Sequence, residues 1–417
     1  MPSRASRALL LALVAAVGLF YLFSPPAPKP IRIGVVHSLS GVMAESERGL
    51  VDAVRLAVEE INAAGGLIGR PLELLVADGA SDWDRSASEA ERLIRDEQVS
   101  VLFACWTSAC RKTLLPVVER NRHLMFYPLQ YEGLEQSEHI VYLGAAPNQQ
   151  IIPGARWAMD TFGPRVYLIG SDYVFPRMAN QLIRHLVTAT GGVIVNERYL
   201  PLTATDFSEL AADIRIKAPD VVLNTVNGAS NRPLFAALKA SRLQQIPVVS
   251  FSIAEPELQA MGAEYFHPAH HAVWGYFQSL PSPANQQFVA AFKQRFGADR
   301  VTSDPIEASY NGVRLWASAV RELGSADPEG VNQVIGRHSV AGPSGVVAID
   351  MATRHAWRRV RVGHARIDGQ FDIADISESM VRPTPFPPYR TRAEWLQLVQ
   401  EPVPVSSSGG LSGSSTP

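Results

Sequence analysis

Residues 31–36 read Ile-Arg-Ile-Gly-Val-Val, a short run rich in β-forming residues that ends before Ser40-Gly41. Apolar residues then recur at helical spacing between residues 47 and 61, and a second apolar run covers residues 72–76. Continuous Val/Ile/Leu strands that alternate with amphipathic helices are typical of parallel sheets covered by helices on both faces. This stretch therefore predicts the first strand–helix–strand unit of an α/β fold.

The same alternation continues along the chain. Further strands are expected at 99–104, 166–169, 193–199, 221–225 and 248–250, with helices at 108–121, 178–190, 207–217 and 232–241. Long helices (284–296 and 303–323) and an antiparallel-looking pair (345–349 and 360–367) follow. Two series of units separated near residue 147 predict two doubly wound parallel-sheet lobes, between which the chain crosses more than once.

Five segments follow from this pattern. They are a leader (1–30), a first lobe (31–147 plus about 275–340), a second lobe (148–274 plus about 341–380), a C-terminal extension (381–400) and a flexible tail (401–417). The leader has Arg4 and Arg7 before an apolar run at 8–23, which as a helix spans about 24 Å, short of a membrane core of roughly 30 Å. This indicates export to the periplasm, with the segment either cleaved as a signal peptide or kept as an inner-membrane anchor.

Composition excludes several classes of protein. The chain has 417 residues, is 47% hydrophobic, and carries a net charge of −2, so it is globular and has no strong field for nucleic acid or an anionic membrane surface. The two cysteines, Cys105 and Cys110, cannot form a disulfide framework or a four-ligand zinc site. If both lay on one helix they would be about 7.5 Å apart along its axis, beyond the ~7 Å bridging limit, so we expect free or buried thiols.

Ligands of open parallel sheets bind outside the carboxyl ends of the strands. The segments at those ends are rich in hydroxyls, carboxamides and aromatic rings, with few cations, and they lie at 37–41, 105–108, 127–132, 171–175, 224–227 and 252–255. We therefore expect a small, neutral ligand that forms many hydrogen bonds, and no cofactor.

Four of the segments resemble one known group of proteins. They are Cys105-Trp-Thr-Ser-Ala-Cys-Arg-Lys112, Phe126-Tyr-Pro-Leu-Gln-Tyr-Glu-Gly133, Ala146-Pro-Asn-Gln149 and Gly170-Ser-Asp-Tyr-Val-Phe-Pro-Arg177. In this order they are similar to the urea- and short-chain-amide-binding branch of the type I periplasmic binding proteins, and the likeness covers about residues 31–376. That branch includes substrate-binding components of urea ABC transporters and an amide sensor that controls amidase expression. The resemblance implies a clamp of two lobes joined by three strands, without catalysis, that delivers its ligand to ABC permease subunits.

The resemblance also implies the ligand contacts. Those of the first lobe are Trp106, Thr107, Ser108, Tyr127 and Gln130; those of the second are Tyr173 and Phe175, with Asn224, Asn227 and Glu255 as further candidates. Ser40, after the first strand, is an additional candidate. At Trp106 and Phe175 the chain follows the transporter pattern, since the amide sensor has tyrosines there.

Each candidate also has a purely structural interpretation. Ser108 is expected to cap the helix that follows it, and its hydroxyl either donates to a ligand carbonyl or only caps. Tyr127 and Tyr173 either line the cleft or belong to the core. Gln130, Asn224 and Glu255 could accept the N–H groups of an amide ligand.

The sequence thus predicts an exported substrate-binding component of an ABC transporter that captures urea or a short aliphatic amide. One alternative is an amide-sensing regulator, soluble or tethered to the membrane. Another is a branched-chain amino acid binding protein, although the predicted loops offer no obvious cleft arginine for a carboxylate. Signatures of phosphate-binding loops, zinc hydrolases and serine hydrolases are absent from the sequence, so we predict neither an enzyme nor a metal site.

Overall fold

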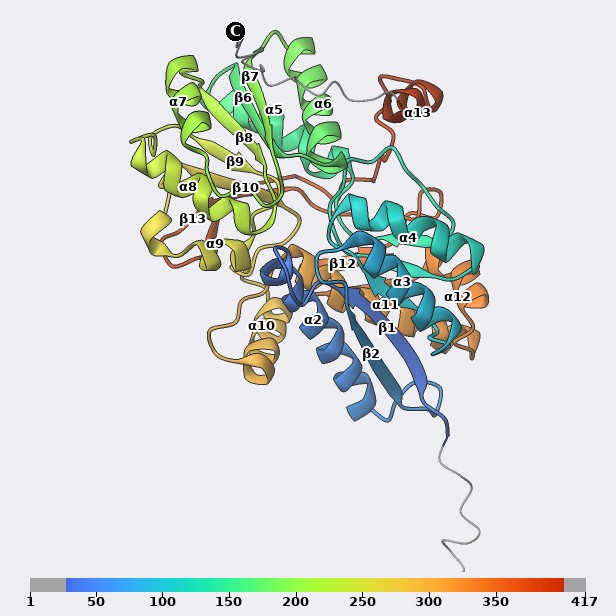
Figure 1. Ribbon diagram of the computed structural model, residues 1–417. Coiled ribbons are helices and arrows are strands. Elements are labelled where there is room, and N and C mark those ends of the chain that lie inside the picture. Colours follow the sequence, from blue (N-terminus) through green and yellow to red (C-terminus); the bar gives the residue numbers. More distant parts are fainter. Residues whose placement is uncertain (1–27, 401–417) are drawn as a thin grey trace, which may run out of the picture.

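The computed structural model describes residues 28–400 and contains two lobes, coloured mainly blue to teal and green to yellow in Figure 1. The predictions for residues 1–27 of the leader and for the tail at 401–417 lie outside the described residues. Within the described residues, no helix is both long enough and apolar enough to cross a membrane.

The first lobe has a five-stranded parallel sheet in the order β2-β1-β3-β4-β5. Its strands are β1 (Ile31–His37), β2 (Leu72–Asp78), β3 (Leu102–Ala104), β4 (Met125–Tyr127) and β5 (Ile140–Tyr142). Its helices include α2 (Ala44–Ala63), α3 (Trp83–Arg95) and α4 (Ser108–Arg120). β1 and β2 pair in parallel with Ile31 opposite Leu72, and α2 connects them, which confirms the predicted strand–helix–strand unit.

The second lobe has a seven-stranded sheet in the order β14-β13-β10-β9-β8-β6-β7. Five strands are parallel: β6 (Arg165–Ser171), β7 (Val193–Leu200), β8 (Val221–Thr225), β9 (Val248–Ser250) and β10 (His270–Trp274). Its helices are α5 (Ile151–Phe162), α6 (Val174–Ala189), α7 (Ser208–Lys217), α8 (Asn231–Ala240) and α9 (Glu255–Met261). The predicted fold class, two doubly wound lobes, is confirmed.

The chain crosses between the lobes three times. It enters the second lobe after β5, returns after β10 as α10 (Pro283–Phe296) and α11 (Asp304–Leu323), and crosses again before β13 (Arg361–Ala365). α11 packs along α2 of the first lobe, below the yellow and green lobe in Figure 1. This arrangement matches the expected three-segment hinge, while the exact lobe boundaries stay a prediction.

One predicted pairing is wrong. β12 (Gly345–Ala348) pairs with β11 (Ser339–Gly342), and β13 pairs with β14 (Phe371–Ile376), so 345–349 and 360–367 are not partners. Each of these two pairs is a local hairpin, because tight turns at residues 343–344 and 366–370 reverse the chain directly.

After β14 the extension leads to α13 (Arg392–Gln400), which lies beside α6 in Figure 1, whereas α12 (Pro328–Val334) follows α11 in the first lobe. The amide of Leu134 donates to the Pro385 carbonyl at 2.9 Å, and the amide of Thr384 donates to Oδ1 of Asn148 at 2.8 Å. Trp395 of α13 is fully buried. The extension therefore belongs to the folded body.

Candidate functional site

The segment between β3 and α4 brings the first lobe's candidate residues to the cleft. Thr107, not Ser108, is the N-cap of α4, since its Oγ1 accepts the amide of Cys110 at 3.2 Å. The predicted cap is therefore displaced by one residue. This frees the Ser108 hydroxyl, which donates to Oε2 of Glu132 at 2.5 Å.

The two cysteines form a disulfide, so the expectation of free thiols is wrong. Cys105 and Cys110 have a Cα–Cα distance of 5.6 Å. Cys105 lies before α4 with a φ of +69°, in the left-handed region, and only Cys110 is helical. The axial distance that argued against a bridge does not apply, because the two residues do not share a helix.

A fully buried arginine, which the sequence reasoning missed, lies behind Ser108. Arg111 donates to Glu135 at 2.7 Å, to Glu132 at 3.2 Å and to the Ser108 hydroxyl at 3.1 Å. Burial alone would raise the pKa of Glu135, but Arg111 and Lys112 lower it to about 2. The guanidinium is thus already paired with carboxylates, and we call Arg111, Glu132 and Glu135 the ion-pair cluster.

Tyr173 faces this cluster from the second lobe. Burial raises its pKa well above the ordinary value, and the nearby Tyr127 and Glu132 groups add to the rise. The Tyr127 hydroxyl donates to the Trp106 carbonyl at 2.7 Å. The rings of Trp83 and Phe175 lie 6.3 and 6.5 Å from that of Tyr173. Tyr173 of the second lobe therefore packs near Trp83 of the first lobe, close enough to Tyr127 and Glu132 for their charges to act on its hydroxyl.

A second buried carboxylate, Glu47 of α2, lies near Tyr173. Its Oε2 accepts Nδ1–H of His37 and the amide of Ser38, both at 2.9 Å. Sequence reasoning missed Glu47 because it stands inside a helix rather than directly after a strand.

Hydrogen bonds of Trp106 and Gln130 join the lobes across the cleft. Nε1 of Trp106 donates to Oδ1 of Asn227 at 3.3 Å, and Nε2 of Gln130 donates to the Phe251 carbonyl at 2.9 Å. Within the described part of the chain, Oε1 of Gln130 is buried without a hydrogen-bond partner. The arrangement is that of a clamp whose halves are in contact.

Three predicted residues lie apart from this group. Ser40 is exposed and donates to Asp78 at 2.7 Å. The side chain of Asn224 forms its hydrogen bonds inside the second lobe, where its Nδ2 donates to Ser250 and its Oδ1 accepts the amide of Val226. Oε1 of Glu255 accepts the amide of Gln278 at 2.7 Å, and burial raises the pKa of Glu255 to about 8. These contacts lie within the second lobe and at its hinge, and Oε2 of Glu255 has no hydrogen-bond partner among the described residues, so a ligand role for Asn224 and Glu255 stays a prediction.

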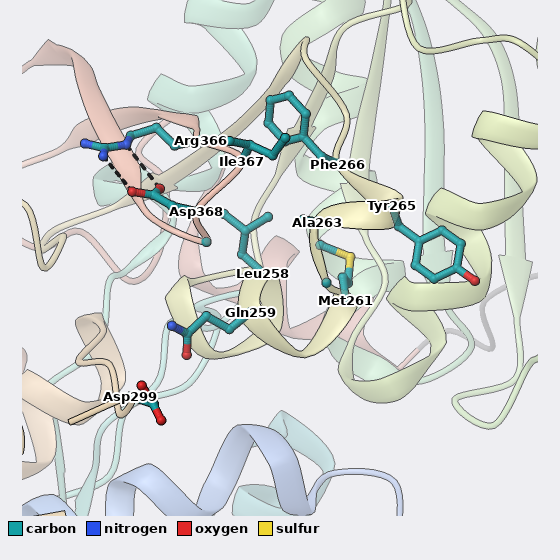
Figure 2. Close-up of a pocket in the computed structure, with 12 residues that line it drawn as sticks. Leu258, Gln259, Met261, Ala263, Tyr265, Phe266, Asp299, Arg366, Ile367 and Asp368 are labelled. Carbon is teal, nitrogen blue, oxygen red and sulfur yellow. Dashed lines mark hydrogen bonds and ion pairs between the residues drawn. The ribbon is translucent and has the colours of Figure 1, made fainter. Parts of the chain in front are cut away.

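A separate cavity of about 320 Å³ lies between α9, the β13–β14 turn and Asp299 (Figure 2). Its walls include Leu258, Met261 and Phe266, and Arg366 at its rim is paired with Asp368 at 2.6 Å. Its lining, as far as the structure describes it, includes none of the predicted ligand contacts. The convergence of polar groups at the cleft therefore makes the cleft the better candidate site.

Residues 31–392 match the periplasmic binding protein domain. The chain belongs to the periplasmic binding protein family. Among curated relatives of this periplasmic binding protein, Leu/Ile/Val-binding protein homolog 7 of Brucella melitensis is 24% identical over 74% of this chain and 82% of that one. The limonene hydroxylase of Geobacillus stearothermophilus is 37% identical over 131 residues, 31% of this chain and 23% of that protein. The chain thus spans less than a quarter of that second relative.

Solved structures share the fold. An ABC transporter solute-binding protein from R. palustris, in complex with 4-hydroxybenzoate, has a TM-score of 0.76 at 21% identity and covers 85% of this chain and 98% of that one. The branched-chain amino acid binding protein of Streptococcus pneumoniae, in complex with isoleucine, has a TM-score of 0.74 at 18% identity and covers 85% and 100%. At these identities the likeness establishes the two-lobed architecture and not the ligand.

Proposed function

We propose that this periplasmic binding protein is an exported substrate-binding component of an ABC transporter, and that its lobes close over urea or a short aliphatic amide. The ABC transporter role is supported by the structural relatives described above. An extracytoplasmic location is supported by the family and by the Cys105–Cys110 disulfide, because disulfides persist mainly in oxidising compartments.

The Ser108–Glu132 hydrogen bond is the observation that favours an amide ligand over a carboxylate ligand. A site for a carboxylate ligand needs donors, but here the Ser108 hydroxyl and Arg111 both donate to buried Glu132. A ligand carboxylate would compete for those donors and approach a like charge, which disfavours binding. An amide offers N–H groups to Glu132 instead.

The remaining polar groups suit the same ligand. Urea carries four N–H hydrogens, and an N–H left unpaired in a closed cleft costs about 1–3 kcal/mol. Glu132, Glu47 and Oε1 of Gln130 are the acceptors in this proposal, and the Tyr173 hydroxyl together with the first amides of α4 are donors to its carbonyl. Because these groups come from both lobes, a bound ligand favours the closed state.

A second candidate is a branched-chain amino acid, favoured by the Leu/Ile/Val-binding homologues and by Glu47, which could accept an ammonium group. Its carboxylate would have to displace the Ser108–Glu132 hydrogen bond. The two candidates therefore differ in what they require of Glu132.

Calorimetry of residues 28–400 distinguishes them. The titrants are urea, formamide, acetamide, leucine, isoleucine and 4-hydroxybenzoate. We expect heat with urea or an amide, with an affinity of roughly tens of micromolar at best, since a four-atom ligand gains at most about 1.5 kcal/mol per atom. Binding of leucine or 4-hydroxybenzoate without binding of any amide would contradict the proposal.

A further inference from the structure

The Cys105–Cys110 disulfide closes the segment through which the first lobe reaches the cleft. We call residues 105–110 the binding loop. At one end the amide of Cys105 donates to the Val36 carbonyl of β1 at 3.1 Å, and at the other Cys110 lies in the first turn of α4. Trp106, Thr107 and Ser108 lie between the two bridged residues.

Three groups of the binding loop form hydrogen bonds with residues outside it, and they point in different directions. The Trp106 carbonyl accepts the Tyr127 hydroxyl, and its indole N–H reaches Asn227 of the other lobe. The Ser108 hydroxyl points back to Glu132. Since one short backbone path sets all three directions, a small rotation at its start would misdirect them together.

The start of that path is conformationally unfavourable. Cys105 has a φ of +69°, a region in which a residue with a Cβ is disfavoured and which must be held by its surroundings. The Thr107 cap fixes the beginning of α4 but does not act on Cys105. The disulfide does, because it ties the Cys105 side chain to the helix.

We propose that the Cys105–Cys110 disulfide is the positioning element of the binding loop, so that affinity for the cleft ligand depends on the bridge being intact. The inference rests on the proposed function for the identity of that ligand. A bridge across so few residues constrains the unfolded chain less than a long one does, so its effect is mainly local. A dithiol reductant that supplies two electrons and two protons converts the bridge to two thiols, and the reductant itself becomes a disulfide; this releases Cys105 from α4 and weakens binding.

The test compares oxidised wild type, wild type reduced with dithiothreitol, and the Cys105→Ser/Cys110→Ser variant. Urea affinity is measured by calorimetry, and hydrogen exchange of amides 106–111 is measured without ligand. We expect a urea Kd at least fivefold weaker, and exchange at least tenfold faster, in both bridge-free forms, with exchange in α11 unchanged. Dithiothreitol should not alter the double variant, which controls for other effects of the reductant.

The outcomes separate the two proposals. A purely structural bridge would lower stability in guanidinium but leave the urea Kd within twofold of wild type, and that result overturns the inference while the proposed function stands. If no form binds urea, the proposed function fails, and hydrogen exchange alone then tests the role of the bridge. Faster exchange confined to residues 106–111 in the bridge-free forms supports the positioning role, and unchanged exchange overturns it.

Discussion

The indole N–H of Trp106, in the first lobe, donates to Oδ1 of Asn227, in the second, over 3.3 Å. Both side chains are buried, and each follows a strand that ends at the cleft. Their contact is possible only when the lobes are together. It therefore stabilises the closed form whether or not a ligand is bound, and ligand affinity should depend on it.

Replacing Trp106 by phenylalanine tests this dependence. Trp106→Phe keeps an aromatic ring but removes the N–H donor, and a net hydrogen bond is worth about 0.5–1.5 kcal/mol, so urea should bind about two- to tenfold more weakly. Calorimetry measures the change. Trp157→Phe is the matched control, because Trp157 packs on Phe162 and His271 within the second lobe. Equal affinities of both variants and wild type would show that the contact does not contribute to closure.

The Glu132→Gln variant tests whether Glu132 accepts a hydrogen bond from the N–H groups of the ligand. The variant removes the negative charge of the buried Glu132 side chain, while Arg111 keeps its contact with Glu135. We expect urea to bind at least about tenfold more weakly, roughly 1.4 kcal/mol, because hydrogen bonds to charged groups are stronger than neutral ones. Glu138→Gln, at an exposed position, is the control in the same titrations. Undiminished urea binding by Glu132→Gln would remove Glu132 from the site.

The C-terminal extension should contribute to stability through Trp395. This side chain is fully buried, donates to the Pro387 carbonyl at 2.8 Å and packs edge-on against His185 of α6. Trp395→Ala should lower the free energy of unfolding by about 3–5 kcal/mol. Leu396→Ala, on an exposed residue of the same helix, should change it by less than about 1 kcal/mol. Guanidinium is the right denaturant, since urea is the proposed ligand; a Trp395→Ala protein as stable as the control would show that the extension is dispensable.

Stability should also vary with pH through Glu255. Burial, with Glu257 and Asp304 nearby, raises its pKa to about 8 in the folded protein, against about 4.3 for an unfolded glutamate. Between these values only the folded state holds the proton, so this contribution is complete below pH ~4.3 and is lost as the pH rises through about 8.

Guanidinium unfolding between pH 5 and 8 measures the effect. Wild type should lose up to about 1.4 kcal/mol per pH unit from this group, and Glu255→Gln should show a shallower slope. Burial raises the pKa of Glu257 and Glu307 as well, so some slope should remain in the variant. Identical slopes would mean that Glu255 is ionised in the folded protein.

The fold could be predicted well from sequence for a simple physical reason. Strands buried on both faces, such as β1 and β8, are mainly apolar, and the helices between them must have one apolar side. The late hairpins were paired wrongly because short strands such as β12 carry no signal for which neighbour they join. Their partners depend on turns rather than on periodicity.

The site could be predicted only in part. Trp106 and Tyr173 follow strand ends and Tyr127 is the last residue of β4, where parallel sheets place their ligands; the Tyr127 hydroxyl contacts the Trp106 carbonyl, and Tyr127 lies near enough to Tyr173 to raise its pKa. Arg111 could not be found in this way, because its role depends on Glu135, which is 24 residues away along the chain. The sequence did point to Glu132 as a site candidate, since it lies in the loop after β4. The disulfide depends on the backbone angle at Cys105, which the sequence does not reveal.

A crystal structure grown with urea tests the central claim most directly. We predict urea between the lobes, with its N–H groups on Glu132, its carbonyl near the Tyr173 hydroxyl, and the Trp106–Asn227 contact intact. Urea found only in the cavity beneath α9, or a co-purified carboxylate that takes the Ser108 hydroxyl from Glu132, would contradict the account.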